Sequence, residues 1–177
     1  EHCRLAIERT LNDLGKHGLP KMGGGDWNDG MNKIGIQGLG ESVWLGFFFY
    51  DLLERFIQIT KTYNPNLDIS RYQEAREKLK NHLNSDAWDG EYYLRAFFDN
   101  GEAVGSASSE ECKIDLISQS FSFLSGVVPM ERKQSVLDAV EHQLVDKKTG
   151  IVKLLTPAFK NSKNYPGYIM DYPVGVR

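Results

Sequence analysis

The sequence predicts a mainly α-helical fold with one small β-hairpin, and three observations lead to this class. Apolar residues recur at helical spacing in five segments along the chain. Segments that are apolar nearly all round alternate with amphipathic ones, as the inner and outer helices of an α/α toroid do. Asp99-Asn100-Gly101, which follows the aromatic run from Tyr92 to Phe98, is a hairpin turn signal. The pattern suits part of an α/α toroid and equally an α bundle.

Composition limits the classes of function. The chain has 177 residues, of which 41% are hydrophobic and 25% are charged, so a single globular domain is expected. With a net charge of -3 and scattered lysines the chain lacks the basic surface that neutralises phosphates, and we predict no nucleic-acid partner. Cys3 and Cys112 form neither a disulfide framework nor a metal-ligand spacing, which favours a cytoplasmic location and predicts no metal site.

The first helix is predicted from apolar residues between Leu5 and Leu14, and it ends at the glycines and the proline of Gly15 to Pro20. It has helical spacing from its first residues and no initiator methionine, which indicates a piece of a larger protein. A glycine-rich segment follows from Pro20 to Gly40. A loop of this length in a compact domain is typical of a functional segment.

The strongest helix is predicted from Glu41 to about Tyr63. Its apolar stripe consists of Leu45, Phe48, Phe49, Leu52, Phe56 and Ile59. Further apolar residues lie on other sides of its first half, so we expect neighbours to pack around it. Charged residues interrupt the run, which excludes a membrane span.

Three further helices are predicted. Ser70-Arg71-Tyr72-Gln73 fits a capping box before a one-sided, half-exposed helix. Apolar spacing predicts helices at about 111 to 125 and about 130 to 145. The tail from Ile151 to Arg177 contains three prolines and is expected to be irregular.

The segment Gly23 to Asn32, GGGDWNDGMN, gathers two carboxylates, an indole and two amides in one loop. Its spacing excludes an EF-hand calcium loop, a phosphate loop and a dinucleotide fingerprint. The residue types suit sugar chemistry, because Trp27 can stack on a pyranose, Asp26 and Asn28 can bond hydroxyls, and a carboxylic acid can protonate a glycosidic oxygen. The alternative left open is that Asp26 and Asn28 cap turns and Trp27 fills a core.

This motif and its surroundings resemble the glycoside hydrolase family 94 phosphorylases, and within them the phosphorylase-type C-terminal domain of cyclic β-1,2-glucan synthases. The resemblance covers essentially the whole chain. It lies in GLPKMGGGDWNDGMNKIG, GESVWLGFF, GEYYLRAFFDNG, ECKID with the following QS, PGYI and YPVGVR.

The resemblance implies an (α/α)6 barrel and inverting phosphorolysis of β-glucosidic bonds, with α-glucose 1-phosphate as a product. It implies that Asp29 is the catalytic general acid and that Trp27 lies against the donor sugar. Asp26 and Asn28 are implied as supporting, substrate-binding residues. Gly30 stands where cellobiose phosphorylases have a cysteine, which favours a β-1,2-linked glucooligosaccharide. No cofactor is implied, because the co-substrate is inorganic phosphate, an anion that attacks without a catalytic base.

Relatives of this kind continue beyond a segment like PVGVR into phosphate-binding residues. Residues 1 to 177 are therefore expected to be a fragment of one (α/α)6 catalytic domain, with the remainder of the barrel missing. We expect the fragment alone to be inactive, with unsealed helix faces open to self-association, and the parent to be anchored at an inner membrane. An inverting hydrolase and a non-catalytic carbohydrate-binding domain stay open as alternatives.

Four charged residues and the four histidines are also singled out. Glu41 either faces the substrate cavity or favours the positive end of its helix dipole. Asp115 or Glu111 would be the base of a hydrolase. Arg95 is interpreted as a partly exposed ion-pair partner, and all four histidines as solvated surface residues.

Overall fold

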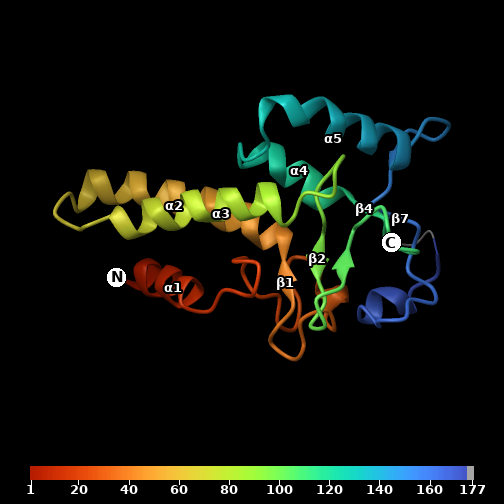
Figure 1. Cartoon of the computed structure of the whole chain (residues 1–177), viewed down its shortest axis with the longest axis horizontal. Helices are drawn as coiled ribbons and strands as arrows, with labels where there is room; N and C mark the ends of the chain where they lie inside the picture. The colour runs from red at the N-terminus through yellow and green to blue at the C-terminus, as the bar shows by residue number, and fades with distance from the viewer. Residues whose placement is uncertain (175–177) are drawn as a thin grey trace.

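The computed structural model describes residues 1–174 and has a mainly α-helical fold with several small strands (Figure 1). The α-helices are α1 (His2–Leu11), α2 (Val43–Tyr63), α3 (Ser70–Ser85), α4 (Leu116–Leu124) and α5 (Met130–Gln143). Two 3-10 turns, η1 (Asp29–Met31) and η2 (Tyr168–Asp171), lie in the long loop and in the tail. The predicted class is confirmed at this level, and the (α/α)6 arrangement stays a prediction.

The main sheet is antiparallel in the order β1 (Glu41–Ser42), β2 (Ala96–Phe97) and β3 (Ala103–Val104). The β2–β3 hairpin confirms the predicted turn, although only two residues of the aromatic run pair as a strand. Two more antiparallel pairs join β4 (Ile114–Asp115) to β7 (Leu155–Thr156) and β5 (Val145–Asp146) to β6 (Ile151–Val152).

Helices α2 and α3 form a long pair that projects from the sheet, with α1 beside them, α4 packed on α2 and α5 packed on α4 (Figure 1). The tail returns close to the long glycine-rich loop, where η2 contacts η1. The loop that precedes α2 is therefore packed between the main sheet and the end of the described chain.

The core runs along α2 and takes in only part of the predicted stripe: Phe49 is buried, and Leu45, Leu52 and Phe56 are half-buried. Val43, Phe47 and Leu53 are fully buried, whereas Phe48 and Ile59 of the stripe are 43% and 58% exposed. Neighbours therefore pack around the first half of the helix as expected, except at Phe48. Because α2 is apolar nearly all round, its periodicity could not show which face has partners within this sequence.

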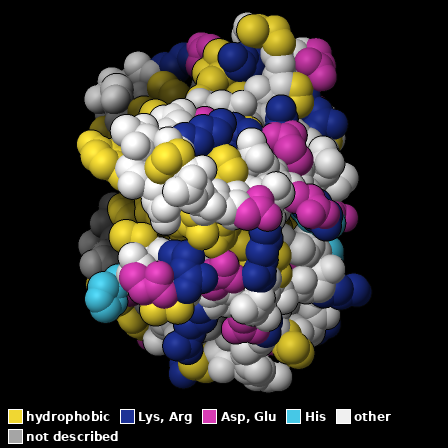
Figure 2. Space-filling view, turned by 90° about the vertical axis from the view of Figure 1, so that its left-hand side faces the viewer, with side chains coloured by type: hydrophobic (Ala, Val, Ile, Leu, Met, Phe, Trp, Pro, Cys, Tyr) yellow, Lys and Arg dark blue, Asp and Glu magenta, His cyan; other side chains and the backbone are white. Residues whose placement is uncertain are grey.

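The residues of the predicted stripe of α2 line a groove of about 570 Å³ between α1 and α2. We call this hollow the α1–α2 groove; its apolar lining includes Ile7, Leu45, Phe48, Leu52 and Ile59. In Figure 2, hydrophobic side chains are visible in the hollow between α1 and the α2–α3 pair. None of the helices in residues 1–174 is long and apolar enough to cross a membrane.

Several predicted boundaries need correction. Ser70 is the first residue of α3 rather than its cap, and its N–H donates to the Asp68 side chain. Helix α4 begins at Leu116 because Ile114 and Asp115 pair with β7. The tail is irregular over most of 151–174, as expected, but it also contains β6, β7 and η2; its last three residues lie outside the described part of the chain.

Candidate active site

The DWND segment, Asp26 to Asp29, turns its side chains alternately inward and outward. The Asp26 side chain is fully buried and Asn28 is 6% exposed. Trp27 is 59% exposed, and Asp29 is also exposed. The alternative in which Trp27 fills a core is therefore wrong. The two outward side chains are the most accessible to a ligand in solution.

Asp26 and Asn28 fix the loop through two successive side-chain turns. The Asp26 carboxylate accepts a hydrogen bond from the Asn28 N–H at 3.0 Å. The Asn28 side-chain oxygen in turn accepts from the Gly30 N–H at 3.1 Å and caps η1. Short polar side chains stabilise turns in this way, so the turn-capping interpretation is confirmed. Asp29 lies between two residues whose backbone is fixed.

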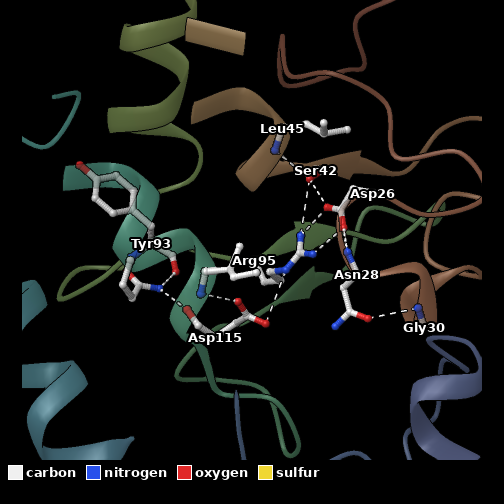
Figure 3. A network of polar contacts seen from close by, with 10 residues as sticks. Asp26, Asn28, Gly30, Ser42, Leu45, Tyr93, Arg95 and Asp115 are labelled. Atoms are coloured by element: carbon white, nitrogen blue, oxygen red, sulfur yellow. Dashed lines mark hydrogen bonds and ion pairs between the residues drawn. The ribbon is translucent and has the colours of Figure 1, made fainter. Parts of the chain in front are cut away.

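Arg95 binds the inner side of this loop (Figure 3). Its Nη1 and Nη2 atoms donate to the two oxygens of Asp26, each at 2.7 Å, and both side chains are fully buried. Burial alone would raise the pKa of Asp26, but the guanidinium and the other donors outweigh it, and the pKa is lowered. Arg95 is thus an ion-pair partner as predicted, but it is not partly exposed.

Ser42 connects the same carboxylate to α2. Its hydroxyl donates to Asp26 and accepts from the Leu45 N–H at 3.0 Å, which makes Ser42 the N-cap of the helix. The loop is therefore attached to the start of the longest helix (Figure 3).

Asp115 lies on the other side of Arg95. Its Oδ2 atom is 3.5 Å from the Arg95 Nε, and its Oδ1 accepts from the Ile117 N–H to cap α4. Burial raises the pKa of Asp115 to about 6, although Arg95 opposes this shift. Asp115 is 1% exposed, so it is a poor candidate for a base that activates water. The Glu111 oxygens accept backbone N–H groups of the tail.

The tail packs on the loop from the opposite side. The Pro166 carbonyl accepts from the Lys33 N–H at 3.1 Å. Ile169 is buried against Gly30: a Cβ added at Gly30 would lie 3.1 Å from the Cβ of Ile169. Helical and strand periodicity gave no sign of this contact, although the resemblance included PGYI.

The model for the glycosyl hydrolase 94 superfamily catalytic domain matches residues 1–177. The chain belongs to this family. It is 43% identical over 177 residues to cyclic beta-(1,2)-glucan synthase NdvB of Rhizobium meliloti (strain 1021), a match that covers 100% of this chain and 6% of that protein. It is 37% identical over 145 residues to solabiose phosphorylase of Paenibacillus borealis, covering 81% and 19%. This glycosyl hydrolase 94 chain thus spans a small part of these relatives.

Among solved structures, the glycosyl hydrolase 94 chain is similar in fold to the GH78 family rhamnosidase of Bacillus sp. GL1. The TM-score is 0.62 at 14% sequence identity, and the match covers 86% of this chain and 15% of that one. The predicted family is confirmed, and this structural likeness concerns the fold alone.

Two residues of the glycosyl hydrolase 94 chain were misjudged from sequence. Glu41 is buried and accepts from the backbone N–H groups of His17 and Leu19, so its carboxylate is occupied in closing a turn. The His17 ring contacts this carboxylate and stacks on Phe97 at 4.0 Å, so it is not a solvated surface residue. No local pattern marks this pair, because its members are 24 residues apart.

Metal-ligating side chains do not gather in the part of the glycosyl hydrolase 94 chain that the structure describes. Within residues 1–174 there is no group of three or more His, Cys, Asp or Glu residues that could hold a metal ion.

Proposed function

We propose that this chain is part of an (α/α)6-barrel catalytic domain that cleaves β-1,2-linked glucooligosaccharides by inverting phosphorolysis. Membership of the glycosyl hydrolase 94 family supports the reaction class, and the similarity to a cyclic beta-(1,2)-glucan synthase supports the linkage. The observation that carries the site is the exposure of Trp27 and Asp29 beside Asp26 and Asn28, whose side chains are held inside.

In the proposed reaction Asp29 donates a proton to the glycosidic oxygen while the bond from that oxygen to the anomeric carbon breaks. A phosphate oxygen attacks the anomeric carbon from the opposite face, which inverts its configuration and yields α-glucose 1-phosphate. Phosphate is already an anion at neutral pH, so no second catalytic carboxylate is required. Trp27 offers a flat apolar face to the sugar ring.

Asp26 and Asn28 support this chemistry in different ways. Arg95, Ser42 and the Asn28 N–H occupy the oxygens of Asp26, so Asp26 acts by holding the loop. The side-chain nitrogen of Asn28 has no hydrogen-bond partner among residues 1–174 and is the group proposed to contact a sugar hydroxyl.

The phosphate-binding groups are proposed to belong to parts of the catalytic domain outside this sequence. The match to solabiose phosphorylase covers 19% of that protein, which leaves room for the remainder of a barrel. The isolated chain is accordingly expected to release no glucose 1-phosphate. No cofactor is proposed, and inorganic phosphate is the co-substrate.

The test measures glucose 1-phosphate release by the full-length parent protein, with and without phosphate, on β-1,2-glucooligosaccharides and on cellobiose. We expect phosphate-dependent release from the β-1,2 substrate. Asp29→Asn should lower it by about 10²- to 10⁴-fold, the usual contribution of a general acid. Asp138→Asn, at an exposed position on α5, is the matched control and should leave the rate unchanged.

Each contrary result points to a different function. Free glucose released without phosphate would indicate a hydrolase. A preference for cellobiose would contradict the proposed linkage. No turnover by the wild-type protein, together with retained sugar binding by Asp29→Asn, would indicate a carbohydrate-binding domain.

A further inference from the structure

Arg95 is a fully buried guanidinium between two carboxylates, those of Asp26 and Asp115. A buried charge is costly unless it is paired, and a bidentate pair fixes the relative orientation of its two planar groups. The position of Asp26 is therefore tied to the position of the Arg95 side chain. Arg95 does not reach the surface where a substrate would bind.

The backbone of Arg95 is itself held on several sides. Its N–H donates to the Val104 carbonyl at 2.7 Å, and its carbonyl accepts from the Val43 N–H at 3.2 Å. Gly105 lies so close to Arg95 that a Cβ added at Gly105 would be 2.6 Å from the backbone nitrogen of Arg95. Arg95 is thus placed by β2, by β3 and by the start of α2.

The buried Gln119 side chain ties this arrangement to α4. It accepts from the Tyr93 N–H at 2.9 Å and donates to the carbonyls of Tyr93 and Asp115. The segment before Arg95 and the cap of α4 therefore share one set of hydrogen bonds (Figure 3).

From Arg95 the contacts lead to the backbone on both sides of Asp29. Arg95 binds Asp26, Asp26 binds the Asn28 N–H, and Asn28 binds the Gly30 N–H. We propose that Arg95 is a positioning residue that orients the exposed Asp29 through this sequence of contacts. The inference rests on the proposed function, in which Asp29 is the general acid.

A substrate that needs no acid separates positioning from general structural damage. A dinitrophenyl β-glucoside loses its leaving group without a proton, whereas a β-1,2-glucooligosaccharide requires protonation of the leaving oxygen. In the full-length parent, Arg95→Lys keeps the charge but loses the bidentate geometry. We expect kcat for the oligosaccharide to fall on the order of 10²-fold, as for a catalytic group that is displaced. The rate with the dinitrophenyl glucoside and the KM for phosphate should stay nearly constant.

Two variants and one control accompany this measurement. Asp26→Asn removes the other half of the ion pair and should show the same selective loss, which keeps the test open if Arg95→Lys does not fold. Arg132→Lys is the control, because Arg132 packs on Trp88 and donates to the Asn84 carbonyl away from the loop. It should lower the melting temperature at most, with both substrates affected alike.

The positioning role is overturned if Arg95→Lys and Asp26→Asn slow both substrates equally, or slow neither. Asp29→Asn supplies the reference. If Asp29→Asn itself fails to discriminate between the substrates, the acid assignment fails. If only Arg95→Lys and Asp26→Asn fail to discriminate, the proposed function stands and the positioning role does not.

Discussion

At the scale of single residues, two opposed effects act on the charge of Asp115. Its side chain caps α4 and faces Arg95, which favours the carboxylate, yet it is sealed from water, which disfavours any charge. Burial is the larger effect and raises the pKa of Asp115 from 3.8 to about 6. Between these two pH values the folded chain binds more protons than the unfolded chain, so the contribution of Asp115 to stability falls as the pH rises.

This linkage predicts the behaviour of Asp115→Asn. Asparagine keeps an oxygen that can cap α4, but its side chain does not ionise. The variant therefore does not lose the stability that wild type loses as Asp115 ionises between about pH 4 and pH 6. The free energy of unfolding of wild type minus that of the variant should fall by at most about 3 kcal/mol over this window and stay constant above it. Urea unfolding of both proteins from pH 4 to pH 7 measures the difference. A difference that does not change with pH would contradict the prediction.

The residue scale also separates what a sequence can predict from what it cannot. The turn-forming roles of Asp26 and Asn28 are local, so residue type and spacing were enough to suggest them. The partner of Asp26 is Arg95, 69 residues away, and the burial of both depends on the packing of β2 and α4. No periodicity contains that information, which is why Arg95 was expected to be partly exposed.

At the scale of elements, the packing of η2 on η1 depends on Gly167. This glycine precedes η2 with φ of 124° and ψ of -171°, a region that is essentially restricted to glycine. An added Cβ would collide with the Gly30 carbonyl oxygen at 2.5 Å and with the Asn32 side chain. The tail can therefore lie against the loop that contains Asp29 only because no side chain stands at position 167.

Gly167→Ala should destabilise the chain by more than about 3 kcal/mol, because strain in the backbone and a backbone collision add. Gly90→Ala is the matched control: its φ is also positive, at 94°, but an added Cβ meets nothing within 4 Å. That variant should lose about 1 kcal/mol, the conformational strain alone. Thermal unfolding followed by circular dichroism compares the two, and equal losses would mean that the contact between η2 and η1 contributes nothing.

Helices were predicted far better than strands at this scale. Each α-helix spans enough residues to repeat its apolar spacing, and α3 is one-sided as expected, with Tyr72, Leu79 and Leu83 buried. The strands are two residues long, too short for alternation to be recognised, and the β1–β2 and β4–β7 pairs join segments far apart in sequence. Ile114 and Asp115 were therefore assigned to a helix that begins after them.

At the scale of the whole molecule, the α1–α2 groove is an apolar surface without a partner in the described residues. It is lined by the stripe of α2 that has the strongest helical periodicity. Large exposed apolar patches mark interfaces, and this chain covers only part of the proteins it resembles. We therefore propose that the feature that predicted a buried helix marks a surface that another chain segment covers in the full-length protein.

In isolation the chain is expected to cover this groove with a second copy of itself. Sedimentation velocity should show a concentration-dependent species larger than a monomer. Phe48→Glu places a charge in the groove at a side chain that is 43% exposed in the single chain, and it should weaken the association by more than about tenfold because that charge would be buried on pairing. Leu124→Glu makes the same change at a 73% exposed position at the end of α4, outside the groove lining, and should leave the association intact. A chain that stays monomeric at every concentration, or an equal effect of the two variants, would show that the groove is not the surface through which copies meet.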